Sequence, residues 1–176
     1  MNYHHIKPLF ISPGIKTGIK IKADNSKEVG ADLIACAVGA STKYGDTALI
    51  VDMGTATTIT YLKNNTIEGV TICPGLNTSK KSLISDTSLL PDVSIEAPSR
   101  VLGNNSSDCI KSGLVYGHAS MIDGLIRRIK KETNEPDINV IITGGLAKLV
   151  SSVMETKVIL DDELIFVGLN TVLDRN

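Results

Sequence analysis

The chain has 176 residues, 42% of them hydrophobic, and its 18 basic and 19 acidic side chains give a net charge of −1. A chain of this length and composition can bury a hydrophobic core, which excludes a disordered, collagen-like or coiled-coil protein. The balanced charge produces no long-range field that favours nucleic acid or an acidic membrane, so we expect neither as a partner.

Three cysteines, Cys36, Cys73 and Cys109, lie far apart and lack the spacing of metal ligands. This pattern is typical of free thiols in a reducing compartment. No apolar run approaches the roughly 18 residues that cross a bilayer, and the N-terminus has no signal-peptide core. We therefore expect a soluble, cytoplasmic protein.

The first thirty residues contain several prolines and glycines, and isoleucines alternate with lysines over residues 15–22. This pattern predicts a loop that leads into a short edge strand. The spacing becomes helical over residues 26–43, where Ser26 occupies the position of an N-cap and Glu28 lies in the first turn.

Three strands are predicted next. Residues 48–51 form a continuous apolar run, typical of a strand buried on both faces, and residues 57–62 are rich in β-branched side chains. Asn64-Asn65 predicts a tight turn into a third strand over residues 66–73, which Pro74-Gly75 ends.

Helices and strands follow in alternation. The longest predicted helix carries an apolar stripe that we expect to be longer than the flanking elements of one chain can cover. Gly113 and Gly117 lie four residues apart on it, which favours the close approach of another backbone, and the alternative is that they accommodate a neighbouring strand. The predicted elements are helices 78–89 and 107–132, strand 140–143, helix 146–154, strand 157–160 and helix 163–173.

From residue 48 onward the predicted order is βββ, α, α, βα, βα. Three sequential strands followed by alternating helices and strands indicate an α/β fold, a mixed sheet with helices on its faces. This is the order of a ribonuclease-H-like lobe.

The sharpest motif is Asp52-Met53-Gly54-Thr55-Ala56-Thr57-Thr58, at the bend between the first two strands of this group. Glycine allows close backbone approach, amides and threonine hydroxyls can donate to phosphate oxygens, and the carboxylate can hold a cation. The alternative is a polar hairpin whose aspartate and threonines only satisfy each other. After a buried strand, phosphate binding is the favoured interpretation.

Two weaker motifs accompany it. Thr143-Gly144-Gly145-Leu146 lies between a predicted strand and helix, where free amides can face a nucleotide. Gly30-Ala31-Asp32 lies in the first helix, and a lone helical aspartate is more often solvated than catalytic. The three histidines, His4, His5 and His118, are isolated, and we interpret them as structural or exposed.

Taken together and in order, these segments resemble the type III pantothenate kinases of the actin-like ATPase superfamily. Members of that family carry a Gly-Ala-Asp-Arg helix, an Asp-Phe-Gly-Thr-Ala-Thr-Thr hairpin and a Thr-Gly-Gly-Leu-Ala turn, among other motifs. The six matching segments here are Gly30–Leu33, Asp52–Thr58, Gly69–Gly75, Gly103–Ser106, Ser112–Gly117 and Thr143–Ala147.

The resemblance implies ATP-dependent phosphorylation of pantothenate to 4′-phosphopantothenate, the first step of coenzyme A synthesis. It implies Asp32 as the general base, Asp52 as the ligand of a monovalent cation (potassium or ammonium), and magnesium with ATP. It also implies a homodimer whose substrate pocket lies near the subunit contact. The implied pantothenate site is Gly30, Ala31, Asp32, Leu33 and Ser106, and the implied ATP site is Gly54, Thr55, Gly144 and Gly145.

The chain also departs from the family pattern. The 176 residues contain no Asp-x-Gly-Asn-Thr phosphate loop, so we expect residues 1–47 to be the remnant of an N-terminal lobe with a connecting helix, and residues 48–176 the C-terminal lobe. Leu33 replaces the arginine that follows the catalytic aspartate, and Ala23 a substrate-contacting tyrosine. Ser106 replaces a threonine and keeps its hydroxyl, and Val70 replaces a glycine.

These departures leave two alternatives open. The chain could be a non-catalytic homologue that acts as a binding or dimerisation module, or a separate polypeptide could supply the missing lobe. Loss of one phosphate loop weighs on catalysis because phosphoryl transfer depends on positioning and charge neutralisation.

Overall fold

The computed structural model describes residues 8–12, 14–22, 29–87 and 89–176. The predicted cap at Ser26, together with Glu28, Ala23, His4 and His5, lies outside these residues. None of the helices in the described part of the chain combines the length and apolar content needed to cross a membrane.

The described chain folds around a six-stranded sheet with the order β1-β4-β3-β2-β5-β6. β2, β3 and β4 are antiparallel neighbours, while β5 is parallel to β2, β6 to β5, and β1 to β4. This confirms the predicted mixed sheet. The strands are β1 (Lys20–Ile21), β2 (Ala48–Met53), β3 (Ala56–Lys63), β4 (Thr66–Pro74), β5 (Val140–Thr143) and β6 (Ile159–Leu160).

Turn and strand chemistry account for the central strands. Asn64 and Asn65 both adopt positive φ angles, 49° and 56°, which the hairpin between β3 and β4 requires. β2 lies in the middle of the sheet with helices on both faces, so its whole apolar run is buried. β1 contributes a two-residue parallel pairing at the edge of β4, as the alternating pattern predicted.

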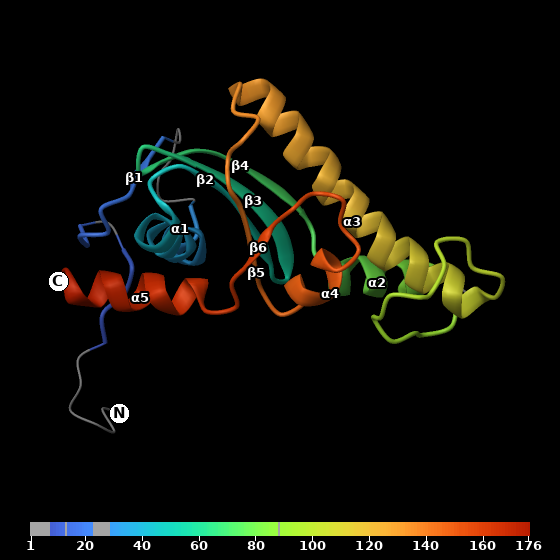
Figure 1. The fold of residues 1–176 in the computed structure, drawn as a ribbon. Coiled ribbons are helices and arrows are strands. Elements are labelled where there is room, and N and C mark those ends of the chain that lie inside the picture. The colour runs from blue at the N-terminus through green and yellow to red at the C-terminus, as the bar shows by residue number, and fades with distance from the viewer. Residues whose placement is uncertain (1–7, 13, 23–28, 88) are drawn as a thin grey trace.

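Alternate residues of the strands point to two separate cores. On one face, Leu49, Val51 and Ile59 pack under α3 (Ser106–Thr133) and α4 (Ala147–Ser151). On the other, Ile50 and Leu62 pack under α1 (Ala31–Tyr44) and α5 (Leu164–Asp174) (Figure 1). The period of two therefore assigns each β2 side chain to one helix layer.

α1 and α5 meet backbone to backbone. A methyl group on Gly168 would overlap the carbonyl oxygen of Ala35, and one on Gly39 would overlap the carbonyl oxygen of Leu164. The side chains of α1 at this crossing are small, which lets the two axes approach closely. The contact fixes the helix that begins beside Asp32 against the C-terminal helix.

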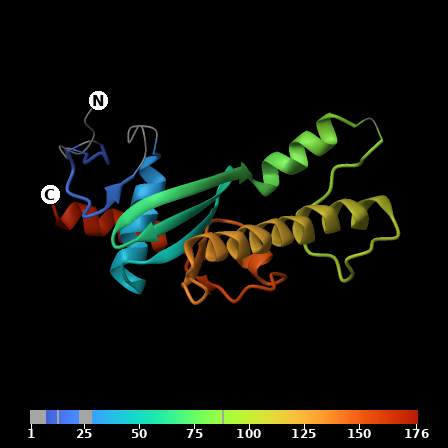
Figure 2. The ribbon, with the colours of Figure 1, turned by 90° about the horizontal axis from the view of Figure 1, so that it is seen from above.

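α2 (Leu76–Ser85), the following loop and the N-terminal half of α3 form an arm that extends away from the sheet (Figure 2). A small satellite core of Val93, Ile110 and Leu114 lies within it. We expected the apolar stripe of α3 to be too long for one chain to bury, and this expectation is wrong. Its C-terminal part packs on the sheet, and its N-terminal part packs on the loop that contains Val93.

Several predicted boundaries shift by a few residues. The helix predicted over residues 78–89 is α2, which begins directly after Gly75 because that residue packs against the Gly54–Thr55 bend. α4 ends at Ser151 rather than at residue 154, where the hydroxyls of Ser151 and Ser152 bond to preceding carbonyls and end the helix locally.

Candidate active site

Three polar side chains meet at the end of β2, on the sheet face that α1 covers. Asp52 is in direct register with Thr58 of β3 and Thr143 of β5. Residues in register on neighbouring strands project to the same face, so these side chains lie next to one another. The thiol of Cys36, from α1, donates a hydrogen bond to Oδ2 of Asp52 at 3.9 Å.

The electrostatics of this corner are acidic. Burial raises the pKa of Asp52, the negative charge of Asp32 raises it further, and the bond from Cys36 opposes the shift in part. Burial, together with the charges of Asp52 and Asp32, raises the pKa of the Cys36 thiol to about 12. Cys36 therefore stays protonated and is a donor here, not a nucleophile.

Asp32 lies in the exposed first turn of α1, and its Oδ1 accepts a hydrogen bond from the backbone N–H of Leu33 at 2.9 Å. A negative charge at this end of a helix is favoured by the helix dipole. A side chain on Gly30 would displace the Asp32 carboxylate. Gly30 and Ala31 also line a neighbouring cavity of about 580 Å³.

A cavity of about 520 Å³ opens at the C-terminal ends of β2 and β5. The turn after β5 closes it from one side, because Gly144 has a φ of 104° and a side chain there would come within 2.6 Å of the carbonyl oxygen of Met53. Ligands commonly bind at this edge of α/β sheets. The lining residues are Cys36, Asp52, Thr143, Gly144, Gly145, Lys148, Asp162 and Ile165.

The Gly54–Thr55 bend beside this cavity is exposed but firmly held. The N–H of Gly75 donates to the Thr55 carbonyl at 3.1 Å, and the Thr78 hydroxyl donates to the same oxygen at 2.9 Å. Within the described residues the N–H of Thr55 has no hydrogen-bond partner. A fixed bend with a free amide can donate to a phosphate oxygen.

The polar-hairpin alternative required the threonine hydroxyls of this motif to donate hydrogen bonds to Asp52. The structure shows no such bond among the described residues. Thr57 bonds to His118 at 2.9 Å on the other face of the sheet. The Thr58 hydroxyl is buried and has no partner among the described residues. The geometry therefore favours an external ligand for Asp52 and Thr58.

Two predicted substrate residues lie apart from this corner. Ser106 is the first residue of α3, at the tip of the arm, and both views place this end of α3 far from α1 (Figures 1 and 2). Leu33 is 9% exposed and packs into the protein, whereas neighbouring Asp32 is exposed. One chain therefore brings together Asp32, Asp52 and the Gly144–Gly145 turn, but not Ser106.

Sequence reasoning missed three residues of this region. Lys148 and Asp162 line the cavity, and His118 holds Thr57. Lys148 could have been found, because it follows the Gly144-Gly145 turn by less than one helical turn. Asp162 and His118 carry no local signal, since their position depends on tertiary packing.

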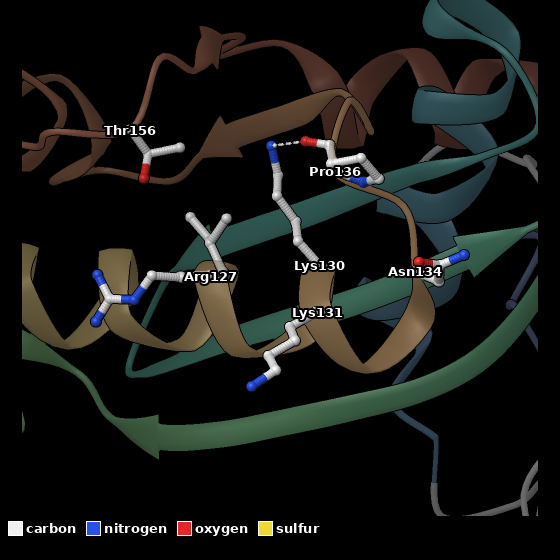
Figure 3. Close-up of a pocket in the computed structure, with 7 residues that line it drawn as sticks. Arg127, Lys130, Lys131, Asn134, Pro136 and Thr156 are labelled. Carbon is white, nitrogen blue, oxygen red and sulfur yellow. Dashed lines mark hydrogen bonds between the residues drawn. The ribbon is translucent and has the colours of Figure 1, made fainter.

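Another cavity, of about 410 Å³, lies at the C-terminal end of α3 and contains none of the predicted site residues. Its cations do not converge. Figure 3 shows the Lys130 ammonium bonded to the Pro136 carbonyl, at 3.0 Å, while Arg127 and Lys131 point in other directions. This arrangement is unlike an anion site, in which several donors face one point.

The fold has relatives among solved structures. A Baf family protein from Campylobacter jejuni superposes with a TM-score of 0.61 at 22% identity, over 90% of this chain and 69% of that one. The ethanolamine utilization protein EutJ from Carboxydothermus hydrogenoformans gives 0.50 at 15% identity, over 82% and 53%. The strand order and these likenesses define a ribonuclease-H-like fold, the class to which actin-like ATPases belong.

Sequence comparison narrows the class to a family. A family model described as Type III pantothenate kinase matches residues 1–128. Proteins named type III pantothenate kinase from Acholeplasma laidlawii, Halalkalibacterium halodurans and a Geobacillus species are 47%, 43% and 38% identical over 99–100% of this chain. The chain spans 68–69% of their length. It belongs to the type III pantothenate kinase family.

Proposed function

We propose that this protein is a kinase that transfers phosphate from ATP to the primary hydroxyl of pantothenate, the first step of coenzyme A biosynthesis. The observation that carries the proposal is the cavity at the end of β2. There Asp52 and the Gly144–Gly145 turn line one space, and the negative charge of Asp32 acts on Asp52. The Gly54–Thr55 bend follows Asp52 along the chain by two residues. The family match and the names of the relatives support the substrate assignment.

Asp32 is the proposed general base. Its carboxylate is exposed, and Oδ1 accepts a hydrogen bond from the Leu33 amide. Among the described residues Oδ2 has no hydrogen-bond partner, so it can accept a proton from the substrate hydroxyl. Gly54, Thr55, Gly144 and Gly145 are the proposed ATP contacts. Their glycines permit close backbone approach, and the free Thr55 amide supplies a donor.

A monovalent cation, potassium or ammonium, fits the corner at Asp52. The buried Thr58 hydroxyl has no partner among the described residues, and the Asp52 carboxylate beside it accepts one weak thiol bond. Both are oxygen ligands of the kind that hard cations prefer. A cation held there would supply positive charge next to the transferring phosphate. Magnesium would enter with ATP, coordinated mainly by the phosphates.

The proposed pantothenate pocket includes Ser106 and is completed by a second copy of the chain. The tip of the arm lies far from α1 in one chain, so Ser106 joins Asp32 only across a subunit contact. Gly113 and Gly117 are exposed on α3, and nothing within the described chain lies within 4 Å of where their side chains would be. This leaves a strip on which a two-fold-related helix can pack.

A non-catalytic binding or dimerisation module is the second candidate, and one observation favours it. Leu33 is buried where the resemblance implies an arginine, so a carboxylate substrate loses a charge-assisted partner. The cytoplasm fits both candidates, because the cysteines are free in the structure.

The deciding experiment incubates the chain with ATP, magnesium and pantothenate, in potassium or in sodium, and measures 4′-phosphopantothenate by mass spectrometry. The kinase proposal predicts product in potassium and none from the Asp32→Asn variant. ATP or pantothenate binding without product in either salt would instead support the binding module.

A further inference from the structure

We propose that His118 is a positioning residue for the Asp52–Thr58 hairpin, and that its hydrogen bond to Thr57 sets the affinity of the site for ATP. The inference rests on the proposed function, because it assigns this hairpin to nucleotide phosphate. It goes beyond that function by giving a role to a buried polar pair on the opposite face of the sheet.

The side chains of Thr57 and Thr58 point to opposite faces of the sheet. Thr58 is in register with Asp52 and shares its face, so Thr57 projects to the other face, toward α3. There its hydroxyl lies 2.9 Å from Nε2 of His118. Thr57 is 1% exposed and His118 is 6% exposed, so water does not compete for either group.

The hydrogen bond between Thr57 and His118 joins two neutral groups. Burial lowers the pKa of His118, so the imidazole is neutral at pH 7. In the tautomer protonated on Nδ1, its Nε2 accepts the hydrogen bond that the Thr57 hydroxyl donates. An apolar pair of similar size would fill this space in the α3 core without requiring a partner. A buried polar pair adds what apolar packing lacks, a single favoured direction for the side chain that carries the hairpin.

Contacts from three neighbouring segments hold the hairpin in place. α2 fixes the Thr55 carbonyl through Gly75 and Thr78, and the turn after β5 packs Gly144 against the backbone of Met53. From α3 comes the hydrogen bond between His118 and Thr57, beside the apolar packing of Met53. A hairpin fixed in this way presents the Thr55 amide in one position, so ATP binding does not have to order it.

The test compares ATP and pantothenate binding by calorimetry, with a non-hydrolysable ATP analogue as the nucleotide probe. Thr57→Val removes the hydroxyl at nearly constant volume, and we expect it to weaken nucleotide binding about tenfold while pantothenate binding changes less than about twofold. Thr57→Ser restores the hydroxyl and should return nucleotide affinity to near the wild-type value. His118→Leu should behave as Thr57→Val, and the double variant should be no weaker than the worse single variant.

The matched control is Tyr44→Phe, which removes a side-chain hydrogen bond to Asp161 in the core under α1, on the sheet face opposite to His118. It should lower thermal stability without changing nucleotide affinity. The inference is overturned if Thr57→Val loses stability as the control does but binds the nucleotide like the wild type. It is also overturned if Thr57→Val weakens the binding of nucleotide and of pantothenate equally. Thr57→Val carries the test by itself if His118→Leu does not fold. A wild-type chain that binds no nucleotide would overturn the proposed ATP site, and this inference with it.

Discussion

Burial of Asp52, at the end of β2, and the negative charge of Asp32, in the first turn of α1, together raise the pKa of Asp52. The two residues come from different elements, and the packing of α1 on the sheet brings them near enough to repel. The charge of the proposed base therefore acts on the proposed cation ligand, and a change at Asp32 alters the ionisation of Asp52.

We predict that Asp32→Asn lowers the rate of pantothenate phosphorylation at least about 100-fold, because it removes the proposed proton acceptor. The fold should persist, since Asp32 is exposed, and ATP affinity should stay within about twofold of the wild type. Loss of the nearby negative charge should also weaken potassium binding at Asp52, because that charge attracts a cation. Calorimetry and a product assay measure these effects, and a variant that keeps most of its turnover would remove Asp32 from the mechanism.

Asp52→Asn should separate stability from cation binding. The raised pKa of Asp52 means that its charged form is disfavoured by burial and by Asp32. In potassium-free buffer at pH 7, removing the charge should raise Tm by about 2–4 °C, equivalent to about 1 kcal/mol. The variant should also lose any stabilisation by added potassium. Asp174→Asn, at an exposed position, is the control, and an unchanged or lower Tm for Asp52→Asn would contradict the prediction.

Gly168→Ala should destabilise the protein by at least about 1–3 kcal/mol, because the added methyl group overlaps the Ala35 carbonyl and forces α5 away from α1. Gly124→Ala is the matched control. Gly124 lies in α3, and no atom of the described chain lies within 4 Å of where its side chain would be. Alanine there should raise the free energy of unfolding of the protein by up to about 1 kcal/mol. Urea unfolding measures both, and equal effects would mean that the α1–α5 contact is less tight than described.

The Asp161 cluster should make stability depend on acid pH. Burial raises the pKa of Asp161, but hydrogen bonds from Lys43 at 2.5 Å, Tyr44 at 2.8 Å and the Glu163 amide prevail and lower it. A lowered pKa in the folded state contributes stability above the unfolded value, about 3.9, which is lost as the pH falls through the folded value.

Asp161→Asn should accordingly cost about 1.5–3 kcal/mol at pH 7, the range for hydrogen bonds to a charged group. The difference from the wild type should shrink as the pH falls below about 4. Urea denaturation at several pH values tests this. A constant difference between pH 7 and pH 3 would show that the charge of Asp161 contributes nothing to the effect.

Gly117→Leu should convert a dimer into a monomer, because the bulky side chain would stand on the exposed strip of α3. Its own fold should be unaffected, since the position is open within the chain. Sedimentation of the wild type and the variant measures the change. A wild-type chain that sediments as a monomer at high micromolar concentration would refute the proposed subunit contact.

Much of the fold could be predicted from local patterns. Strand β5 has the predicted bounds, and β2 begins at the predicted residue, because a continuous apolar run identifies a strand buried on both faces. The cover of the α3 stripe could not be predicted. It depends on a loop around Val93 that has no regular pattern and folds back on Ile110 and Leu114.

The residues of the candidate site also include some that local sequence patterns indicate and some that they do not. Asp32, Asp52 and the two glycine turns could be proposed from the sequence because each lies in a contiguous motif that the family resemblance covers. The partners of those motifs could not, since Cys36 reaches Asp52, and His118 reaches Thr57, only through packing of helices on opposite faces of the sheet. Tertiary packing decides these contacts, and single-sequence patterns do not contain it.

The length of α3 gives the arm a mechanical consequence. With 28 residues the helix is about 42 Å long, so a tilt of about 3° where it rests on the sheet would move its far end by about 2 Å. Ser106 lies at that end. The helix thus acts as a lever, and small changes in how α3 packs on β3 become displacements of the proposed substrate contact that are large enough to change turnover.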